Sequence, residues 1–450
     1  MGRREAKRSS HCLCTTPRTG SATARYYGAP SAAYNPPPMT PPALPSRCDV
    51  LVIGAGPAGS ACTQLLARAG REVLMVDQHD FPRDKICGDG LIPDAHAALR
   101  RLGVYDEVAA VATPVKFVRC VGPRGGHVDV PGSLSVLPRK QLDHILVRAA
   151  ERAGARLATP WRFEAPLVEG ERVVGARLKS LAGDAAVHEV RADWVVLATG
   201  AVPQALTAAG LCDRHTPSGV ALRGYVKCDA LVGVITQLQL VWHPRLRGGY
   251  GWIFPAPGGL FNIGAGQTGS HKRQRDGKGR MEGANLRDMF EAFAAVYAPA
   301  GELMRSGTLQ GEIKGAPLRC TLVGSRWSRP GLLATGEAIG STYAFSGEGI
   351  GKAMETGMLA AHALLDTAAA PIGDAAVQAH YEAGVKKLKP QFDLYQTASH
   401  VNHHPWLADL VIWRGRKSPR ILKRLSGVLE ETQNPGRLFT MSGLRKLIFE

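Results

Sequence analysis

The hydrophobic pattern first becomes regular near residue 49, where it predicts a strand, a helix and a second strand. Residues 50–53 are four consecutive apolar residues, which is the pattern of a strand buried on both faces in a parallel sheet. Residues 60–70 are rich in Ala and Leu and predict a helix. A second apolar run at residues 73–76 predicts the next strand, which ends at Asp77. Together these elements predict a βαβ unit.

A glycine-rich hexapeptide joins the first strand to the helix and reads Gly54-Ala55-Gly56-Pro57-Ala58-Gly59. In this pattern Gly54 permits the tight turn, Gly56 lets a pyrophosphate approach the backbone, and Gly59 allows close helix–sheet packing. The N-terminus of the helix favours the diphosphate. An ionised Asp77 accepts both hydrogen bonds of a ribose diol and repels a 2′-phosphate, which favours FAD or NAD. No second fingerprint of this kind follows in the chain. We therefore expect one bound FAD, and a reduced nicotinamide would reach it without a Rossmann domain of its own.

Two later segments combine apolar periodicity with glycines. Tyr250, Trp252 and Phe254 alternate along one strand face, and a strand at residues 260–263 completes a hairpin. Such an aromatic face is typical either of a core or of a cavity wall. Residues 346–349 read Ser-Gly-Glu-Gly and open a helix predicted over 350–365. Amides at its start can stabilise negative charge on a reduced flavin, although a plain turn is the alternative.

The C-terminal region predicts basic amphipathic helices. Ser418 and Pro419 have the pattern of an N-cap and first helical residue. One helix face is then apolar (Ile421, Leu422, Leu425, Val428 and Leu429) and the other is basic (Arg420, Lys423 and Arg424). Such helices either lie on a membrane surface or cover a domain.

Charge is concentrated at the two ends of the chain. The net charge is +17 over 450 residues, of which residues 1–46 carry +5 and residues 385–450 carry +7. The mildly basic middle argues against a nucleic-acid enzyme. Residues 1–46 contain eight prolines and predict a disordered tail. The tail has the composition of an organellar transit peptide, and the alternative is translation from Met39.

The amino-acid composition limits the classes of protein that remain possible. A hydrophobic content of 45% is sufficient for a globular core, and the absence of a run of about 18 apolar residues predicts no membrane-spanning helix. The nine cysteines show no C-x-x-C spacing, which indicates neither a metal site nor a redox dithiol. We therefore expect a cytoplasmic protein, with membrane association and organellar targeting by residues 1–38 as alternatives. The oligomeric state is left open.

Three motifs resemble those of geranylgeranyl reductase-family flavoproteins. They are residues 81–91 (FPRDKICGDGL), residues 250–255 (YGWIFP), and residues 333–340 followed by 346–350 (LATGEAIG and SGEGI). Arg247 replaces the proline that the family has before the tyrosine, and Glu337 replaces the usual aspartate. A Thr199-Gly200 pair stands after the strand at residues 194–198.

The resemblance implies an α/β fold of the glutathione-reductase type. A Rossmann-like FAD-binding domain (residues 47–112, 136–210 and 318–370) would be interleaved with an antiparallel-sheet substrate domain (113–135 and 211–317), followed by a helical region (371–450). Cys87, Tyr250 and Trp252 are the expected catalytic residues. The expected FAD-binding residues are Gly54, Gly56, Pro57, Ala58, Gly59, Asp77, Arg83, Gly88, Arg139, Gly200, Gly336, Glu337, Gly347, Gly349 and Ile350.

The resulting hypothesis is an FAD-dependent reductase of isoprenoid-type double bonds. Reduced flavin would deliver a hydride to one alkene carbon and a proton donor, Cys87 or Tyr250, would serve the other. NAD(P)H or another external reductant would supply electrons, and a small hydrophobic molecule or lipid would be the substrate. The alternative enzyme is an FAD-dependent monooxygenase or halogenase acting on a small aromatic or carrier-bound metabolite. A third hypothesis is a protein that binds flavin without catalysing a reaction, because a fold does not determine function.

Overall fold

The predicted βαβ unit forms the centre of the fold in the computed structural model, which describes residues 44–183, 185–212, 217–246, 248–268, 285–366 and 373–433. Strand β1 (Arg47–Ile53) leads into helix α1 (Pro57–Arg68) and strand β2 (Val73–Val76), and the two strands are parallel. Helix α1 begins three residues earlier than expected because Pro57 occupies its first turn. The segment predicted to be a disordered tail or a transit peptide lies almost entirely outside the described residues, which begin at residue 44.

Sheet A is an eight-stranded sheet around this unit. Its strands β16, β9, β1, β2 and β6 are parallel neighbours in that order, and β15, β8 and β7 extend it in antiparallel pairs. The further bounds are β6 (Arg156–Ala158), β7 (Trp161–Glu169), β8 (Arg172–Ser180), β9 (Val187–Leu197), β15 (Ser328–Arg329) and β16 (Leu332–Ala334).

Sheet B has the strand order β14-β10-β13-β12-β11-β4-β5-β3 and is antiparallel except for the pair β4 and β11. Its bounds are β3 (Gly90–Leu91), β4 (Thr113–Val121), β5 (His127–Val136), β10 (Gly219–Lys227), β11 (Leu238–Val241), β12 (Gly249–Ala256), β13 (Leu260–Thr268) and β14 (Thr308–Leu318). The predicted aromatic hairpin is the pair β12 and β13.

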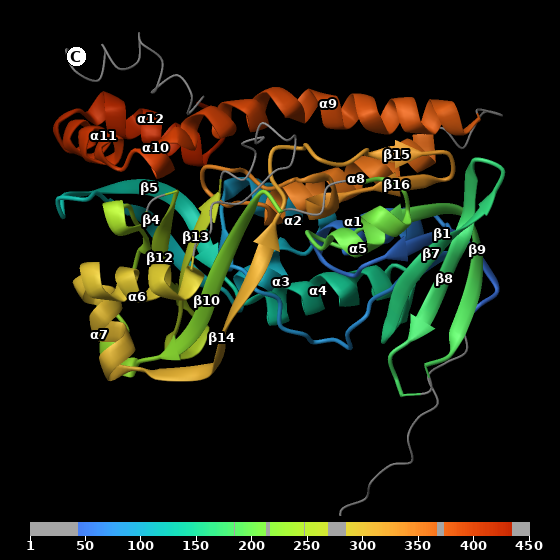
Figure 1. Ribbon diagram of the computed structural model, residues 1–450, viewed down its shortest axis with the longest axis horizontal. Helices are drawn as coiled ribbons and strands as arrows, with labels where there is room; N and C mark the ends of the chain where they lie inside the picture. The colour runs from blue at the N-terminus through green and yellow to red at the C-terminus, as the bar shows by residue number, and fades with distance from the viewer. Residues whose placement is uncertain are drawn as a thin grey trace, which may run out of the picture. The chain divides into compact units, whose positions relative to one another are not determined.

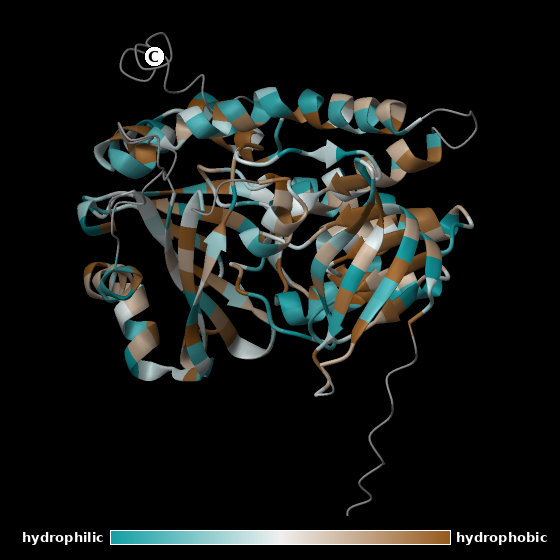
Figure 2. Ribbon diagram, turned by 45° about the vertical axis from the view of Figure 1, so that its right-hand side comes forward, coloured by the Kyte–Doolittle hydropathy of each residue, from teal (hydrophilic) through white to brown (hydrophobic). Residues whose placement is uncertain are grey.

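Helices cover both sheets (Figure 1). Around sheet A lie α2 (Pro93–Leu102), α3 (Tyr105–Ala109), α4 (Arg139–Arg152), α5 (Pro203–Ala208) and α8 (Ile350–Asp366), and one face of sheet B is covered by α6 (Leu286–Val296) and α7 (Ala298–Ser306). Hydrophobic and hydrophilic residues alternate along several of the outer strands (Figure 2). The central strands β1 and β2 instead carry consecutive buried apolar residues, as expected for a parallel sheet that is covered on both faces.

The C-terminal helices cross the remaining face. They are α9 (Asp374–Ala398), α10 (His400–His403), α11 (Trp406–Lys417) and α12 (Pro419–Leu429). Ser418 accepts a hydrogen bond from the Ile421 amide, as its N-cap pattern predicts. Helices α11 and α12 both contact strand β5 and therefore roof sheet B. The fold class predicted from the sequence is confirmed. The domain limits stay a prediction, because the chain from Pro41 onward forms one compact unit.

Candidate active site

A cavity of about 770 Å³ lies beside the end of β1 and continues beneath α11 and α12. Sixteen of the eighteen candidate residues line it: Gly54, Gly56, Pro57, Ala58, Asp77, Arg83, Cys87, Gly88, Arg139, Gly200, Tyr250, Trp252, Glu337, Gly347, Gly349 and Ile350. The other two, Gly59 and Gly336, support the cavity from outside. A Cβ on Gly59 would lie 1.8 Å from the Gly54 carbonyl oxygen, and one on Gly336 would lie 2.6 Å from the Ala58 Cβ.

The glycine loop is held by the acid that follows β2. Gly54 has a φ of +103°, and a Cβ there would lie 2.4 Å from the Ala198 carbonyl oxygen, so the turn requires glycine. Asp77 Oδ2 accepts a hydrogen bond of 2.9 Å from the Ala55 amide, and Oδ1 accepts one of 3.0 Å from the His79 amide. The carboxylate is thereby fixed at the cavity edge with lone pairs left for a ribose diol.

Two arginines converge on the loop through a shared carboxylate. Arg139 donates to both oxygens of Asp143 at 2.6 and 2.8 Å, and the residue is buried with an exposure of 8%. Arg83 Nη1 lies 3.0 Å from Asp143 Oδ2, yet it is buried and makes no hydrogen bond. A Cβ on Gly56 would lie 3.7 Å from Arg83 Nη2 and 3.9 Å from Arg139 Nη2, so the glycine faces both guanidinium groups.

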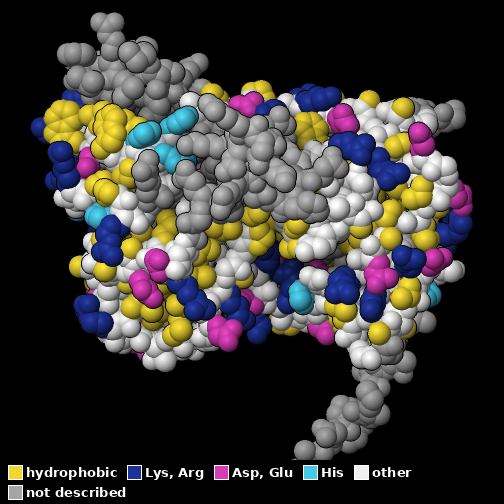
Figure 3. All heavy atoms as spheres, viewed as in Figure 1, with side chains coloured by type: hydrophobic (Ala, Val, Ile, Leu, Met, Phe, Trp, Pro, Cys, Tyr) yellow, Lys and Arg dark blue, Asp and Glu magenta, His cyan; other side chains and the backbone are white. Residues whose placement is uncertain are grey.

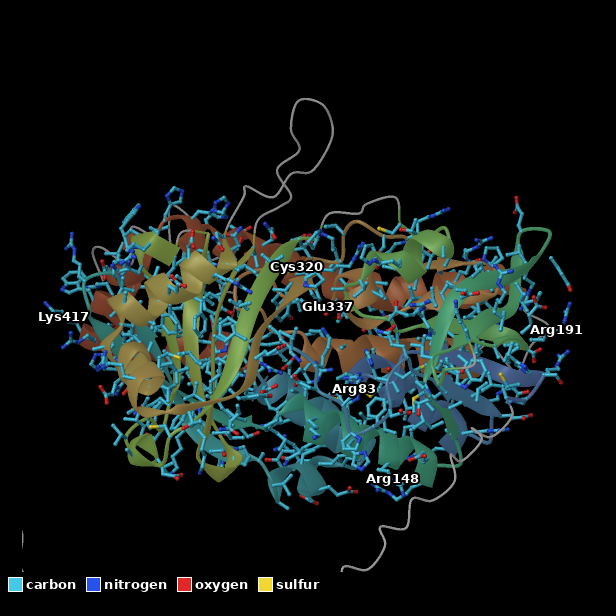
Figure 4. All side chains as sticks on the ribbon, turned by 60° about the horizontal axis from the view of Figure 1, so that its bottom comes forward. Arg83, Arg148, Arg191, Cys320, Glu337 and Lys417 are labelled. Atoms are coloured by element: carbon cyan, nitrogen blue, oxygen red, sulfur yellow. The ribbon has the colours of Figure 1, made fainter. Side chains whose placement is uncertain are left out.

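These features fit the diphosphate of FAD. A buried guanidinium nitrogen without a hydrogen-bond partner, beside a glycine loop at a helix N-terminus, favours the binding of an anion. Arg83 and Arg139 would hold the diphosphate, and Asp77 the ribose. Figure 4 shows Arg83 and Glu337 near the centre of the structure, whereas Arg148 lies at its edge.

The aromatic residues of β12 form one cavity wall. The ring centroids of Tyr250 and Trp252 are 6.3 Å apart, and those of Trp252 and Phe254 are 6.4 Å apart. The Tyr250 hydroxyl donates a hydrogen bond to the Ser346 carbonyl oxygen, which ties this wall to the turn before α8. Of the two alternatives for this aromatic strand face, the structure therefore supports a cavity wall and not a closed core.

The turn before α8 contributes an acid that the sequence reasoning had not singled out. Gly347 has a φ of +70°, and a Cβ there would lie 3.0 Å from the Tyr250 hydroxyl oxygen. Glu348 lines the cavity. Burial raises the pKa of its carboxyl to about 8, and the nearby carboxylates of Asp94 and Glu431 add to this effect.

Glu337, the acid of the second motif, also lines the cavity. Its carboxylate accepts a hydrogen bond of 3.3 Å from the Thr342 hydroxyl.

The Cys87 segment is held by strands that the sequence reasoning had not connected with it. Arg223 of β10 donates to the Asp84 carboxylate at 2.6 Å and to the Lys85 carbonyl at 3.0 Å. Tyr225 of the same strand and Asn262 of β13 both donate to the carboxylate of Asp89. The local signal was a polar residue between apolar neighbours within a strand, as at Asn262 in β13 and Arg223 in β10.

The far half of the cavity is apolar. Sheet B and the C-terminal helices supply its walls: Val118, Cys120, Val128, Val130, Leu238, Leu240, Trp242, Phe345, Val401, Ala408, Val411, Ile412, Leu425, Val428 and Leu429. An apolar extension that adjoins a dinucleotide site can take up a long hydrophobic molecule. Among the helices in the described ranges, none is long and apolar enough to cross a membrane.

The fold and the dinucleotide end of the cavity define an FAD-dependent oxidoreductase. Residues 47–235 match the FAD binding domain family. The menaquinone reductase of Mycolicibacterium smegmatis is 31% identical over 360 residues, covering 75% of this chain and 82% of its own. The digeranylgeranylglycerophospholipid reductase of Methanoculleus marisnigri is 27% identical over 328 residues, covering 71% and 76% respectively. The chain belongs to the geranylgeranyl reductase family of flavoproteins.

Solved structures share the fold. A geranylgeranyl bacteriochlorophyll reductase-like protein from Thermoplasma acidophilum superposes with a TM-score of 0.64 at 21% identity, covering 90% of this chain and 96% of its own. A flavin-dependent brominase superposes with a TM-score of 0.67 at 20% identity, covering 89% and 98%. Because reductases and halogenases share this architecture, the substrate has to be argued from the cavity.

Proposed function

We propose that the protein reduces a carbon–carbon double bond in the isoprenoid chain of a lipid or quinone. The observation that carries this proposal is the apolar half of the cavity, which continues from the dinucleotide end and in which the described lining residues form no cluster of charged groups. Relatives named as menaquinone and digeranylgeranylglycerophospholipid reductases support a prenyl substrate. NAD(P)H or another external reductant would provide the electrons.

Bound FAD in its reduced form supplies the hydride for such a reaction. The chain itself has to hold the alkene, exclude water and provide a proton. Tyr250, Trp252 and Phe254 present an apolar wall that does the first two. For the proton, the Tyr250 O–H already donates to the Ser346 carbonyl. The Cys87 sulfur instead accepts a hydrogen bond from the Asp89 amide at 3.4 Å, so its S–H remains available.

Burial keeps this thiol protonated. Desolvation raises the pKa of Cys87, and the Arg139 guanidinium only partly opposes this effect. A thiol that stays protonated at neutral pH can serve as a general acid. We therefore assign the proton to Cys87 Sγ.

Anaerobic turnover tests the proposal. The FAD-loaded protein is reduced with dithionite and incubated with menaquinone or with a geranylgeranyl lipid, and the lipid is analysed by mass spectrometry. Gain of two hydrogens per double bond is the expected result. An unchanged lipid would contradict the proposal, and gain of an oxygen in air with an aromatic compound would favour a monooxygenase.

We further propose that α11 and α12 contact an anionic membrane that supplies the lipid. Trp406 and Trp413 are 61% and 46% exposed and lie seven residues apart on α11. Basic side chains accompany them at Arg414, Arg416, Lys417, Arg420, Lys423 and Arg424. Figure 3 shows hydrophobic and basic side chains side by side at this end of the structure. Exposed tryptophans next to basic residues fit the interface of an anionic bilayer.

A further inference from the structure

A buried amide connects two of the candidate catalytic residues. Asn262 is fully buried in the middle of β13, directly between Phe254 of β12 and Tyr225 of β10. Its Nδ2 donates to the Cys87 carbonyl oxygen at 2.7 Å, and its Oδ1 accepts from the Trp252 Nε1 at 2.9 Å. One side chain thus fixes both the Cys87 backbone and the Trp252 ring.

The chemistry of its neighbours determines how this amide is oriented. The indole N–H of Trp252 only donates, so it must face Oδ1 of Asn262. The Cys87 carbonyl only accepts, so it must face Nδ2. The second Nδ2 hydrogen is directed at Asp89 Oδ2, 2.7 Å away. Asparagine is disfavoured inside strands, and here every hydrogen bond of the amide goes to the Cys87 segment or to the cavity wall.

Asp89 is the second member of this connection. It is fully buried and adopts a φ of +66°, which is uncommon for a residue other than glycine. The Tyr225 hydroxyl and the Asn262 amide both donate to Oδ2, and the Arg139 amide donates to Oδ1 at 3.3 Å. Three donors surround the carboxylate and favour its charged form, which opposes the cost of burial.

The same contacts constrain the thiol. The Asp89 amide donates to Cys87 Sγ at 3.4 Å, and the Arg223 Nε donates to the Cys87 carbonyl at 3.4 Å. On the cavity side, a Cβ on Gly88 would lie 3.2 Å from the Phe254 ring. The segment from Cys87 to Asp89 is therefore held by strands of sheet B more than 130 residues away in sequence.

We propose that Asn262 and Asp89 are positioning residues that set the Cys87 thiol and the Trp252 ring as one rigid unit. The inference rests on the proposed function only for its turnover readout. A small displacement of a reacting group lowers the rate strongly, on the order of 100-fold for 1 Å. Release of the segment also admits water to the thiol and makes it easier to ionise.

The test compares Asn262→Ala with Gln239→Leu in the FAD-loaded protein. Gln239 is also a buried amide of sheet B, but its partner is Tyr297 and it does not line the cavity. The first readout is the rate at which iodoacetamide alkylates Cys87, followed by mass spectrometry of its peptide. We expect an increase on the order of tenfold in Asn262→Ala only. The second readout is lipid reduction by the reduced enzyme, where we expect a loss on the order of 10- to 100-fold at unchanged flavin content.

Tyr225→Phe is the second variant, and it removes only the hydroxyl that donates to Asp89. If Asn262→Ala does not fold, a faster alkylation of Cys87 in Tyr225→Phe, with a shifted pH profile, supports the proposal. Equal alkylation rates in a folded variant and in Gln239→Leu would overturn it. A wild-type protein that reduces no prenyl lipid would refute the proposed function alone, because the alkylation readout does not depend on the substrate.

Discussion

Lys352 Nζ lies 2.8 Å from Glu431 Oε2 and joins α8 to the residues that follow α12. The lysine is buried with a side-chain exposure of 7%, and it also contacts Glu355 at 2.8 Å and Asp94 at 4.0 Å. The Tyr343 hydroxyl donates to the other oxygen of Glu431 at 2.8 Å. A single cation therefore compensates three carboxylates beneath the helix that roofs the cavity.

Removal of this cation is expected to destabilise the protein. Lys352→Met removes the cation that all three carboxylates contact, and loss of one member of a buried ion pair costs about 3–5 kcal/mol. Urea unfolding of the purified protein measures the change. Lys386→Met, which removes a pair whose lysine is 66% exposed, should change stability by less than about 0.5 kcal/mol. Equal effects of the two variants would contradict the central role of Lys352.

Glu348 should make stability fall as pH rises. Its pKa is raised from 4.5 to about 8 in the folded protein, mainly by burial. A raised pKa contributes stability that is complete below the unfolded value and is lost as pH rises through the folded value. Glu348→Gln removes this titration, so the Tm of the wild type should fall relative to the variant between about pH 5 and pH 9. For a compact unit of this size the Tm would shift by roughly 1 °C for each kcal/mol. The same dependence of Tm on pH in both proteins would argue against a buried carboxyl at this position.

Arg83 should contribute directly to FAD affinity. Arg83→Met removes the guanidinium whose buried Nη1 lies beside Asp143 but makes no hydrogen bond in the protein. Loss of a charge-assisted hydrogen bond corresponds to a Kd roughly 10–100-fold higher. Calorimetric titration of the FAD-free protein measures this constant. Arg148→Met, at a residue with 58% side-chain exposure, is the control and should leave the Kd unchanged.

The far half of the cavity should select for chain length. Val130 is 3% exposed and lines this half on β5. Val130→Phe fills part of the space, so KM should rise for a twenty-carbon prenyl chain and stay constant for a ten-carbon one. Val168→Phe, on the exposed face of β7, provides the control. The same KM change for both chain lengths would place the substrate elsewhere.

Membrane contact should depend on the two exposed tryptophans of α11. We expect the double variant Trp406→Ala, Trp413→Ala to lose on the order of tenfold in binding to vesicles that contain phosphatidylglycerol. Co-sedimentation measures this binding, and it should weaken with added salt because basic residues contribute. Leu181→Ala alters an exposed apolar residue just after the end of β8, and this variant should bind as the wild type does. Unchanged sedimentation of the double variant would rule out this surface.

Contiguous motifs made much of the dinucleotide end predictable. The strand, glycine loop, helix and acid of residues 50–77 lie within one βαβ unit, so their spacing alone places Gly56 and Asp77 together. The period of two likewise indicated that Tyr250, Trp252 and Phe254 share a face.

Long-range pairing explains what the sequence could not reveal. Tyr225 faces Asn262 only because β10 and β13 pair in one particular register, and both reach Asp89 more than 130 residues away. The contact between Lys352 and Glu431 depends in the same way on how α12 returns to α8. Local propensity carries no information about such contacts.

The order of strands along the chain has a practical consequence. Among the described elements, the chain passes from sheet A to sheet B after β2, returns after β5, leaves again after β9 and returns after β14. Neither half of the cavity is therefore encoded by a continuous stretch of sequence. A truncated gene cannot yield a separate flavin-binding or lipid-binding module, and a change of substrate preference has to be engineered within the intact chain.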